Sequence, residues 1–89
     1  MTNLELAQKI VELIGGKDNI LKVANCMTRL RVTLKDESKV NSEELKKTVG
    51  ILGIVQDGSY IQIVLGPGKA KKVADICIEE LKLPKDTLV

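Results

Sequence analysis

Apolar residues recur at helical spacing near both ends of the chain. A capping box formed by Thr2 and Glu5 opens the first such stretch, and Gly15-Gly16 supplies a left-handed exit. This pattern predicts a helix over residues 3–14. After Gly66-Pro67-Gly68, the same kind of spacing predicts a last helix over residues 69–82.

A short third helix is predicted in the middle of the chain. Asn41 or Ser42 can cap it, and Gly50 follows its end. Helical spacing then places Leu45 and Val49 on the side that faces the core.

Apolar and polar residues alternate between the first two helices. Over residues 29–35 the alternation is strict, with Leu30, Val32 and Leu34 on one face and polar side chains on the other, which predicts a half-buried strand. Residues 20–24 are β-prone and predict a preceding strand with Leu21 and Val23 on one face. The two strands should form a hairpin with Cys26 at its tip.

A second hairpin is predicted around Asp57-Gly58, because this dipeptide between apolar runs favours a type I′ turn. Its strands would cover residues 51–56 and 59–65, with Val55 opposite Tyr60. One face then carries Leu52, Ile54, Ile61, Ile63 and Leu65, and the other, less buried face carries Val55, Tyr60, Gln62 and Val64.

The predicted order of elements is α-β-β-α-β-β-α, which favours an α+β two-layer sandwich. We expect a four-stranded antiparallel sheet with three helices on one face and the other face open. A chain of 89 residues is sufficient for one domain, predicted over residues 1–83, with a C-terminal tail or linker at residues 84–89.

Composition excludes several functions. Tyr60 is the sole aromatic residue and the net charge is only +2, so base stacking and binding along a phosphate backbone are disfavoured, and no nucleic-acid partner is expected. Histidine is absent, which removes His-based triads and most zinc sites; no metal or cofactor is expected. No apolar run is long enough to cross a bilayer, so we expect a cytoplasmic domain that does not insert into the membrane.

The candidate chemistry lies at the first hairpin. Cys26 is followed by Arg29 and Arg31, and no acidic residue lies between Asp18 and Asp36. Positive charge favours the thiolate, the nucleophilic form of cysteine. The two arginines share one face of a strand with Cα atoms about 6.6 Å apart, and a guanidinium donates in pairs to phosphate oxygens.

Other candidates have ordinary structural explanations. Cys77 lies on the inner stripe of the last helix, where packing explains it, and its distance from Cys26 matches no redox or metal motif. The Gly66-Pro67-Gly68-Lys69 segment resembles an anion-binding helix start but lacks a full phosphate-loop fingerprint.

One stretch carries a family resemblance. Asn19-Ile20, five further residues, and then Cys26-x-Thr28-Arg29-Leu30-x-Val32-x-Leu34-x-Asp36 resembles the phosphorylation-site signature of type 1 EIIB domains, the glucose/sucrose superfamily of the bacterial phosphoenolpyruvate-dependent sugar phosphotransferase system. The resemblance extends over the second hairpin and nearly the whole chain. It implies the same α-β-β-α-β-β-α sandwich.

The resemblance also implies a reaction. Cys26 would be the phosphocysteine nucleophile of a phosphotransferase component, accepting a phosphoryl group from an EIIA phosphohistidine and passing it to a sugar in the membrane EIIC domain. Arg29 and Arg31 would hold the phosphoryl group. The Thr28 hydroxyl and the Met27 backbone amide would bind it as well, although Thr28 is equally well explained as a turn residue.

The open sheet face, with Tyr60, Val55 and Val64, is predicted to dock EIIA. The isolated domain is expected to be monomeric, and the resemblance leaves the sugar open. A rival hypothesis is a non-catalytic regulatory module that binds an anion or RNA through the basic face. A redox role is disfavoured by the predicted burial of Cys77.

Overall fold

The computed structural model describes residues 1–86. Three helices and four strands follow one another in the predicted order. They are α1 (Asn3–Leu13), β1 (Ile20–Asn25), β2 (Arg29–Leu34), α2 (Ser42–Lys47), β3 (Gly53–Asp57), β4 (Tyr60–Val64) and α3 (Lys69–Glu79), with short 3-10 turns η1 (Lys17–Asn19) and η2 (Glu37–Lys39).

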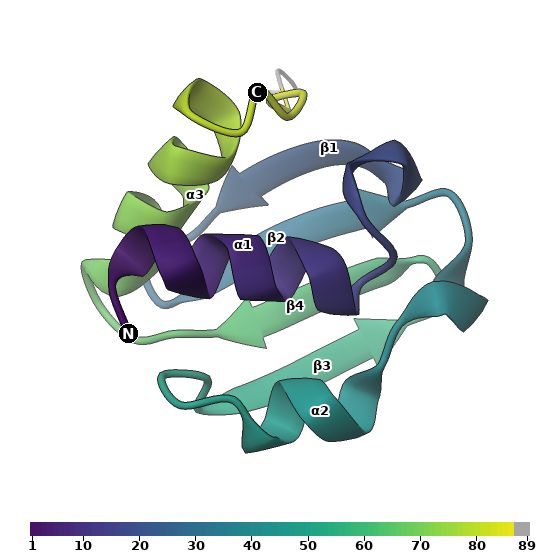
Figure 1. The fold of residues 1–89 in the computed structure, drawn as a ribbon, viewed down its shortest axis with the longest axis horizontal. Coiled ribbons are helices and arrows are strands. Elements are labelled where there is room, and N and C mark those ends of the chain that lie inside the picture. Colours follow the sequence, from purple (N-terminus) through teal and green to yellow (C-terminus); the bar gives the residue numbers. More distant parts are fainter. Residues whose placement is uncertain (87–89) are drawn as a thin grey trace.

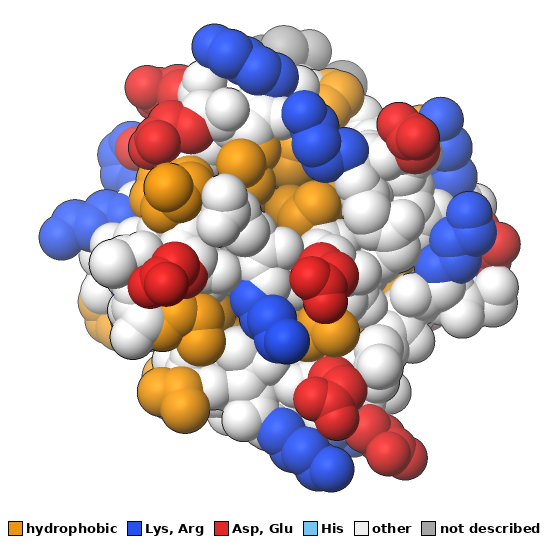
Figure 2. Space-filling view, in the orientation of Figure 1, with side chains coloured by type: hydrophobic (Ala, Val, Ile, Leu, Met, Phe, Trp, Pro, Cys, Tyr) orange, Lys and Arg blue, Asp and Glu red, His pale blue; other side chains and the backbone are white. Residues whose placement is uncertain are grey.

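The four strands form one antiparallel sheet in the order β1-β2-β4-β3. All three helices lie on one side of it: α1 crosses in front of the central strands, α2 lies over β3, and α3 packs beside α1 (Figure 1). Figure 2 shows acidic and basic side chains interspersed over this helical side. The predicted α+β sandwich with one open sheet face is therefore confirmed.

The core between the layers is aliphatic. The inward positions of β2 and β4 are almost completely buried, as alternation predicts. Side chains from α1 and α3 close the core from the other side, and its largest fully buried members include Leu6, Ile10, Leu30, Ile61, Ile63 and Val73. The outward residues of the same strands are left on the open face, which is where the arginines of β2 lie.

The start of α1 follows the predicted capping box. The Glu5 carboxylate accepts from the Thr2 backbone N–H at 2.7 Å, and the Glu5 N–H donates to the Thr2 hydroxyl at 3.1 Å. These reciprocal bonds satisfy amide groups that a helix start leaves without partners.

The predicted facing of β1 is wrong at Leu21. Leu21 is 46% exposed, whereas Ile20 and Val23 are both buried. The pairing with β2 shifts between Ile20 and Lys22, which marks a β-bulge. A bulge adds one residue to a strand and thereby breaks the alternation.

Two apolar residues predicted to face the core are exposed. Val49 is 78% exposed because α2 ends at Lys47, so helical spacing no longer sets its direction. Leu52 is 72% exposed because β3 begins only at Gly53, beyond the reach of strand alternation.

The second hairpin forms with a shifted turn. Asp57 pairs with Tyr60, so Gly58 and Ser59 are the central loop residues and Val55 lies opposite Gln62. Gly58 has a φ of 60°, and among the described non-glycine residues only Lys82 has a positive φ. A type I′ turn needs positive φ at both central residues, so the Asp-Gly prediction is wrong; a glycine at the first central position is typical of type II′. The shift is by two residues, so each side chain keeps its predicted face.

The segment after α3 pairs with the free edge of β1. The Val23 N–H donates to the Pro84 carbonyl at 2.8 Å, and the Asp86 N–H donates to the Val23 carbonyl at 2.8 Å. Lys22 and Asp86 add an ion pair at 3.7 Å. The predicted tail thus begins as a parallel extension of the sheet, and its remaining part, residues 87–89, lies outside the described residues.

These contacts make the segment a contributor to stability. A chain ending at Leu83 is expected to lose about 1–3 kcal/mol of unfolding free energy relative to a chain ending at Asp86, because the two hydrogen bonds to Val23 are removed. Urea denaturation of the two chains measures the difference. Equal midpoints and slopes would contradict a stabilising role for residues 84–86.

Candidate phosphoryl-transfer site

The candidate site is built around the loop that joins β1 to β2. Cys26 follows the last residue of β1, and its N–H donates to the Arg29 carbonyl at 3.0 Å, which closes the hairpin. The Asn25 side-chain amide donates to the Cys26 carbonyl at 3.1 Å. The predicted position of Cys26 at a hairpin tip is confirmed.

A second segment holds this loop from outside the hairpin. The N–H groups of Leu65 and Gly66 both donate to the Thr28 carbonyl, at 2.9 Å and 3.0 Å. Gly66 has a φ of 94°, a conformation that favours glycine, so the chain can turn here while both amides face Thr28. The loop is therefore fixed by the connection between β4 and α3.

The Cys26 thiol lies in a polarising environment and is partly exposed. Hydrogen bonding from the Thr28 N–H contributes most to lowering the thiol pKa below its ordinary value, and partial burial opposes that effect. The Arg29 N–H and the Arg31 guanidinium lower the pKa further. A lowered pKa increases the thiolate fraction near neutral pH, so this sulfur is suited to act as a nucleophile.

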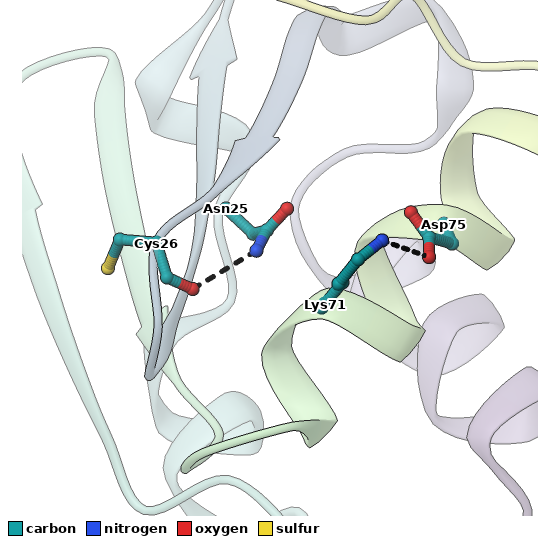
Figure 3. Close-up of polar contacts among 4 residues, drawn as sticks. All are labelled: Asn25, Cys26, Lys71 and Asp75. Carbon is teal, nitrogen blue, oxygen red and sulfur yellow. Dashed lines mark hydrogen bonds and ion pairs between the residues drawn. The ribbon is translucent and has the colours of Figure 1, made fainter.

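The thiol points away from α3. In Figure 3 the Asn25 side chain extends towards Lys71 and Asp75, whereas the sulfur of Cys26 lies on the opposite side. Lys71 and Asp75 pair with each other at 2.9 Å. They line a groove of about 310 Å³ between β1, α3 and the C-terminal segment. The sulfur itself does not point towards this groove.

Arg29 and Arg31 lie on the open face of the sheet, beside the hairpin tip. Arg29 is half-buried and Arg31 is exposed. Within residues 1–86, neither guanidinium has a carboxylate at ion-pair distance. Both guanidinium groups are therefore available to pair with an anion at the hairpin tip.

The other residues singled out from the sequence lie at different distances from the thiol. The Thr28 N–H lowers the pKa of the thiol, whereas the Met27 side chain is 79% exposed. Val64 pairs with Arg29 across β2 and β4. Val55 is opposite Gln62, and Tyr60 lies four residues from Val64, about 13 Å further along the strand.

Comparison with known proteins identifies the family. Residues 8–41, which include the hairpin, match the family described as "phosphotransferase system, EIIB". Over 71 residues, or 80% of the chain, the sequence is 51% identical to the "PTS system N-acetylmuramic acid-specific EIIBC component" of Pasteurella multocida (strain Pm70). It is 46% identical over 71 residues to the "PTS system MurNAc-GlcNAc-specific EIIBC component" of Staphylococcus aureus (strain USA300).

A solved structure agrees. The crystal structure of one domain of the PTS system IIabc component from Clostridium difficile superposes with a TM-score of 0.80 and is 29% identical, covering 98% of this chain and 90% of that one. The chain belongs to the EIIB family of the phosphotransferase system. It spans 15% of the length of the P. multocida relative and 14% of the S. aureus relative.

This EIIB chain contains no helix, within its described residues, with the length and apolarity needed to cross a membrane.

The second cysteine, Cys77, differs from Cys26 in exposure and in the direction of its pKa shift. Cys77 is 1% exposed on the inner side of α3, and burial raises its pKa to about 11. The prediction that Cys77 is a packing residue is confirmed.

Sequence reasoning gave no role to one polar residue of this EIIB site. Gln62 lies on β4 directly opposite Arg31, and its Oε1 accepts from Arg29 Nη1 at 3.4 Å. Alternation alone places Gln62 on the open face, the face that also carries the arginines. The contact with Arg29 could be found only once the pairing of β2 with β4 was known.

Proposed function

We propose that this EIIB chain is a phosphoryl carrier in sugar uptake. Cys26 accepts a phosphoryl group from a phosphohistidine of an EIIA protein and passes it to a sugar bound by an EIIC domain. The main support is the setting of the thiol, which has a lowered pKa and two neighbouring arginines without carboxylate partners among residues 1–86. Phosphoryl transfer requires mainly a positioned nucleophile and charge neutralisation.

The proposed reaction has two displacements at phosphorus. In the first, the Cys26 thiolate attacks, the S–P bond forms, the N–P bond of the phosphohistidine breaks, and its electron pair stays on the imidazole nitrogen. In the second, a sugar hydroxyl oxygen attacks, the O–P bond forms, the S–P bond breaks with its electrons returning to sulfur, and the hydroxyl proton passes to solvent. Arg29 and Arg31 stabilise the negative charge on the phosphoryl oxygens in both steps.

The partners follow from the family. The relatives are named EIIBC components, which supports an EIIC partner for this chain and a position at the cytoplasmic face of the membrane. We propose that EIIA docks on the open face. There Val64 lies opposite Arg29, Val55 lies in the same cross-strand row as Arg31, and Tyr60 extends the surface along β4. The Thr28 hydroxyl and the Met27 amide are proposed to contact the phosphoryl group at the hairpin tip.

The names of the relatives also support a sugar class. Relatives at 51%, 42% and 46% identity are described as specific for N-acetylmuramic acid or for MurNAc-GlcNAc. We propose that the sugar served by this carrier contains N-acetylmuramic acid.

One experiment tests the reaction and the sugar in sequence. Incubation with an EIIA protein phosphorylated on histidine should make the chain heavier by one phosphoryl group, detected by intact-protein mass spectrometry. Cys26→Ser should abolish the gain, because a serine hydroxyl is a much weaker nucleophile at neutral pH than a thiolate. Cys77→Ser is the matched control and should be phosphorylated fully.

The second stage adds membranes that carry the EIIC part of the P. multocida relative. Phosphate should leave Cys26 with N-acetylmuramic acid present and stay with glucose present. A phosphate that persists in Cys26→Ser would refute the carrier assignment. A phosphate-free wild type that binds inorganic phosphate, with binding lost in Arg29→Ala and kept in Cys26→Ser, would instead support a non-catalytic anion-binding module.

A further inference from the structure

Gln62 lies at the centre of the open face. One row of cross-strand neighbours runs from Ala24 through Arg31 and Gln62 to Val55. Arg29 belongs to the neighbouring row, opposite Val64, so its contact with Gln62 is diagonal across the β2–β4 pair. Long side chains reach such diagonal neighbours in an antiparallel sheet.

The contact gives the two arginines different environments. Arg29 Nη1 donates to Gln62 Oε1 at 3.4 Å, which directs this guanidinium over β4. The Arg31 guanidinium contributes instead to lowering the pKa of the Cys26 thiol, after the larger effect of the Thr28 N–H. Arg29 affects that sulfur only through its backbone N–H. The hydrogen bond thus holds the Arg29 guanidinium over β4, on the same sheet face as Arg31.

An amide suits this position because it is neutral. A carboxylate here would pair with Arg29 and cancel much of its positive charge, whereas the Gln62 carbonyl accepts one N–H and leaves the charge intact. At 3.4 Å the bond is longer than the usual range of about 2.7–3.2 Å for N–H···O, so Arg29 can exchange it for a phosphoryl oxygen. Four more N–H groups of the guanidinium remain available.

We propose that Gln62 is a positioning residue that holds Arg29 beside the hairpin tip, ready for the phosphoryl group on Cys26. The proposal rests on the proposed carrier function and adds a residue to it. Side chains held in place before the reaction lose less freedom when the transition state forms.

The test uses two substitutions at Gln62 with a control for each. Gln62→Leu removes the acceptor, and Gln62→Glu keeps an acceptor but adds negative charge. Gln56→Leu and Gln56→Glu are the controls. Gln56 is exposed on the same hairpin and pairs with Ile61, so its cross-strand row contains no arginine. Circular dichroism is the check that all four variants fold.

The first measurement does not depend on phosphoryl transfer. Proton exchange of the Arg29 side-chain N–H groups, followed by nitrogen-15 NMR, should be several-fold faster in Gln62→Leu than in wild type. It should stay slow in Gln62→Glu and in both controls. In Gln62→Glu the pH profile of Cys26 alkylation should move to higher pH, because the new carboxylate offsets the positive charge near the thiolate.

The second measurement is the rate of phosphoryl transfer from EIIA to Cys26. Gln62→Leu should be about tenfold slower than Gln56→Leu, the size of effect expected for one hydrogen bond to a charged group. Unchanged Arg29 exchange in Gln62→Leu, or a transfer rate equal to that of Gln56→Leu, would overturn the proposal. If wild type is never phosphorylated, the carrier function fails, and the exchange measurement still decides whether Gln62 holds Arg29.

Discussion

Cys26 is expected to react with iodoacetamide at least about 100-fold faster than Cys77 in the folded protein at pH 7, because only thiolates react and the two pKa values move in opposite directions. Burial raises the Cys77 pKa to about 11. Hydrogen bonding from the Thr28 N–H leads the interactions that lower the Cys26 pKa. Cys77 is also shielded from the reagent, which adds to the difference.

The direction in which the Cys26 alkylation rate changes with pH follows from its lowered pKa. A lowered pKa means that the Cys26 thiolate forms at lower pH than that of a free thiol, so its alkylation rate should reach a plateau earlier as pH rises. Peptide mass spectrometry after timed labelling gives both rates. In Arg31→Gln the Cys26 profile should shift to higher pH, while Cys77→Ala should leave it unchanged. Equal labelling of the two cysteines at pH 7 would contradict the assigned environments.

Local patterns predicted much of the fold. The capping box at Thr2 and Glu5, the alternation along β2 and the order of the elements depend on neighbours a few residues apart, and all are confirmed. The exposure of Leu21 and Leu52 could not be derived in this way. It depends on a bulge and on where β3 begins, which are set by pairing between strands that are distant in sequence.

In the candidate site, too, some features follow from local patterns and others depend on long-range pairing. Placing Arg29 and Arg31 on one face beside Cys26 requires only strand periodicity. Anchoring the loop through the Thr28 carbonyl requires Leu65 and Gly66 to lie next to it, and the Gln62 contact requires the β2–β4 register. The sequence predicts which side chains share the open face, and the long-range pairing determines which of them meet.

Asn19 shows how a local interpretation can miss a structural role. It lies in the short turn η1 before β1, where polar residues are usually exposed, yet it is only 3% exposed. Its amide nitrogen donates to the Ile14 carbonyl at 2.7 Å and to the Asp36 carbonyl at 2.9 Å, and its carbonyl oxygen accepts from the Asp36 N–H at 2.9 Å. One side chain thus joins the end of α1 to the end of β2.

Replacing this side chain is expected to destabilise the fold strongly. Asn19→Ala should lower the free energy of unfolding by about 2–4 kcal/mol, because three hydrogen bonds are lost and backbone groups near the core lose their partners. Asn25→Ala is the matched control: its single bond is at the surface, so the loss should stay within about 0.5 kcal/mol. Urea denaturation of both variants measures the two losses of unfolding free energy. A loss no larger than that of the control would refute the structural role of Asn19.

Gly15 provides a test of the same contact from the other side. It has a φ of 106°, and a Cβ there would lie 2.6 Å from Asn19 Nδ2 and 2.9 Å from Lys39 Cβ. Gly15→Ala should therefore destabilise the fold partly by displacing the Asn19 amide. Because Asn19→Ala already removes that amide, the double variant should lose less stability than the sum of the two single variants. Full additivity would mean that Gly15→Ala acts through backbone strain and through its contacts with Lys39 Cβ and with the Asn19 Cβ, which alanine keeps.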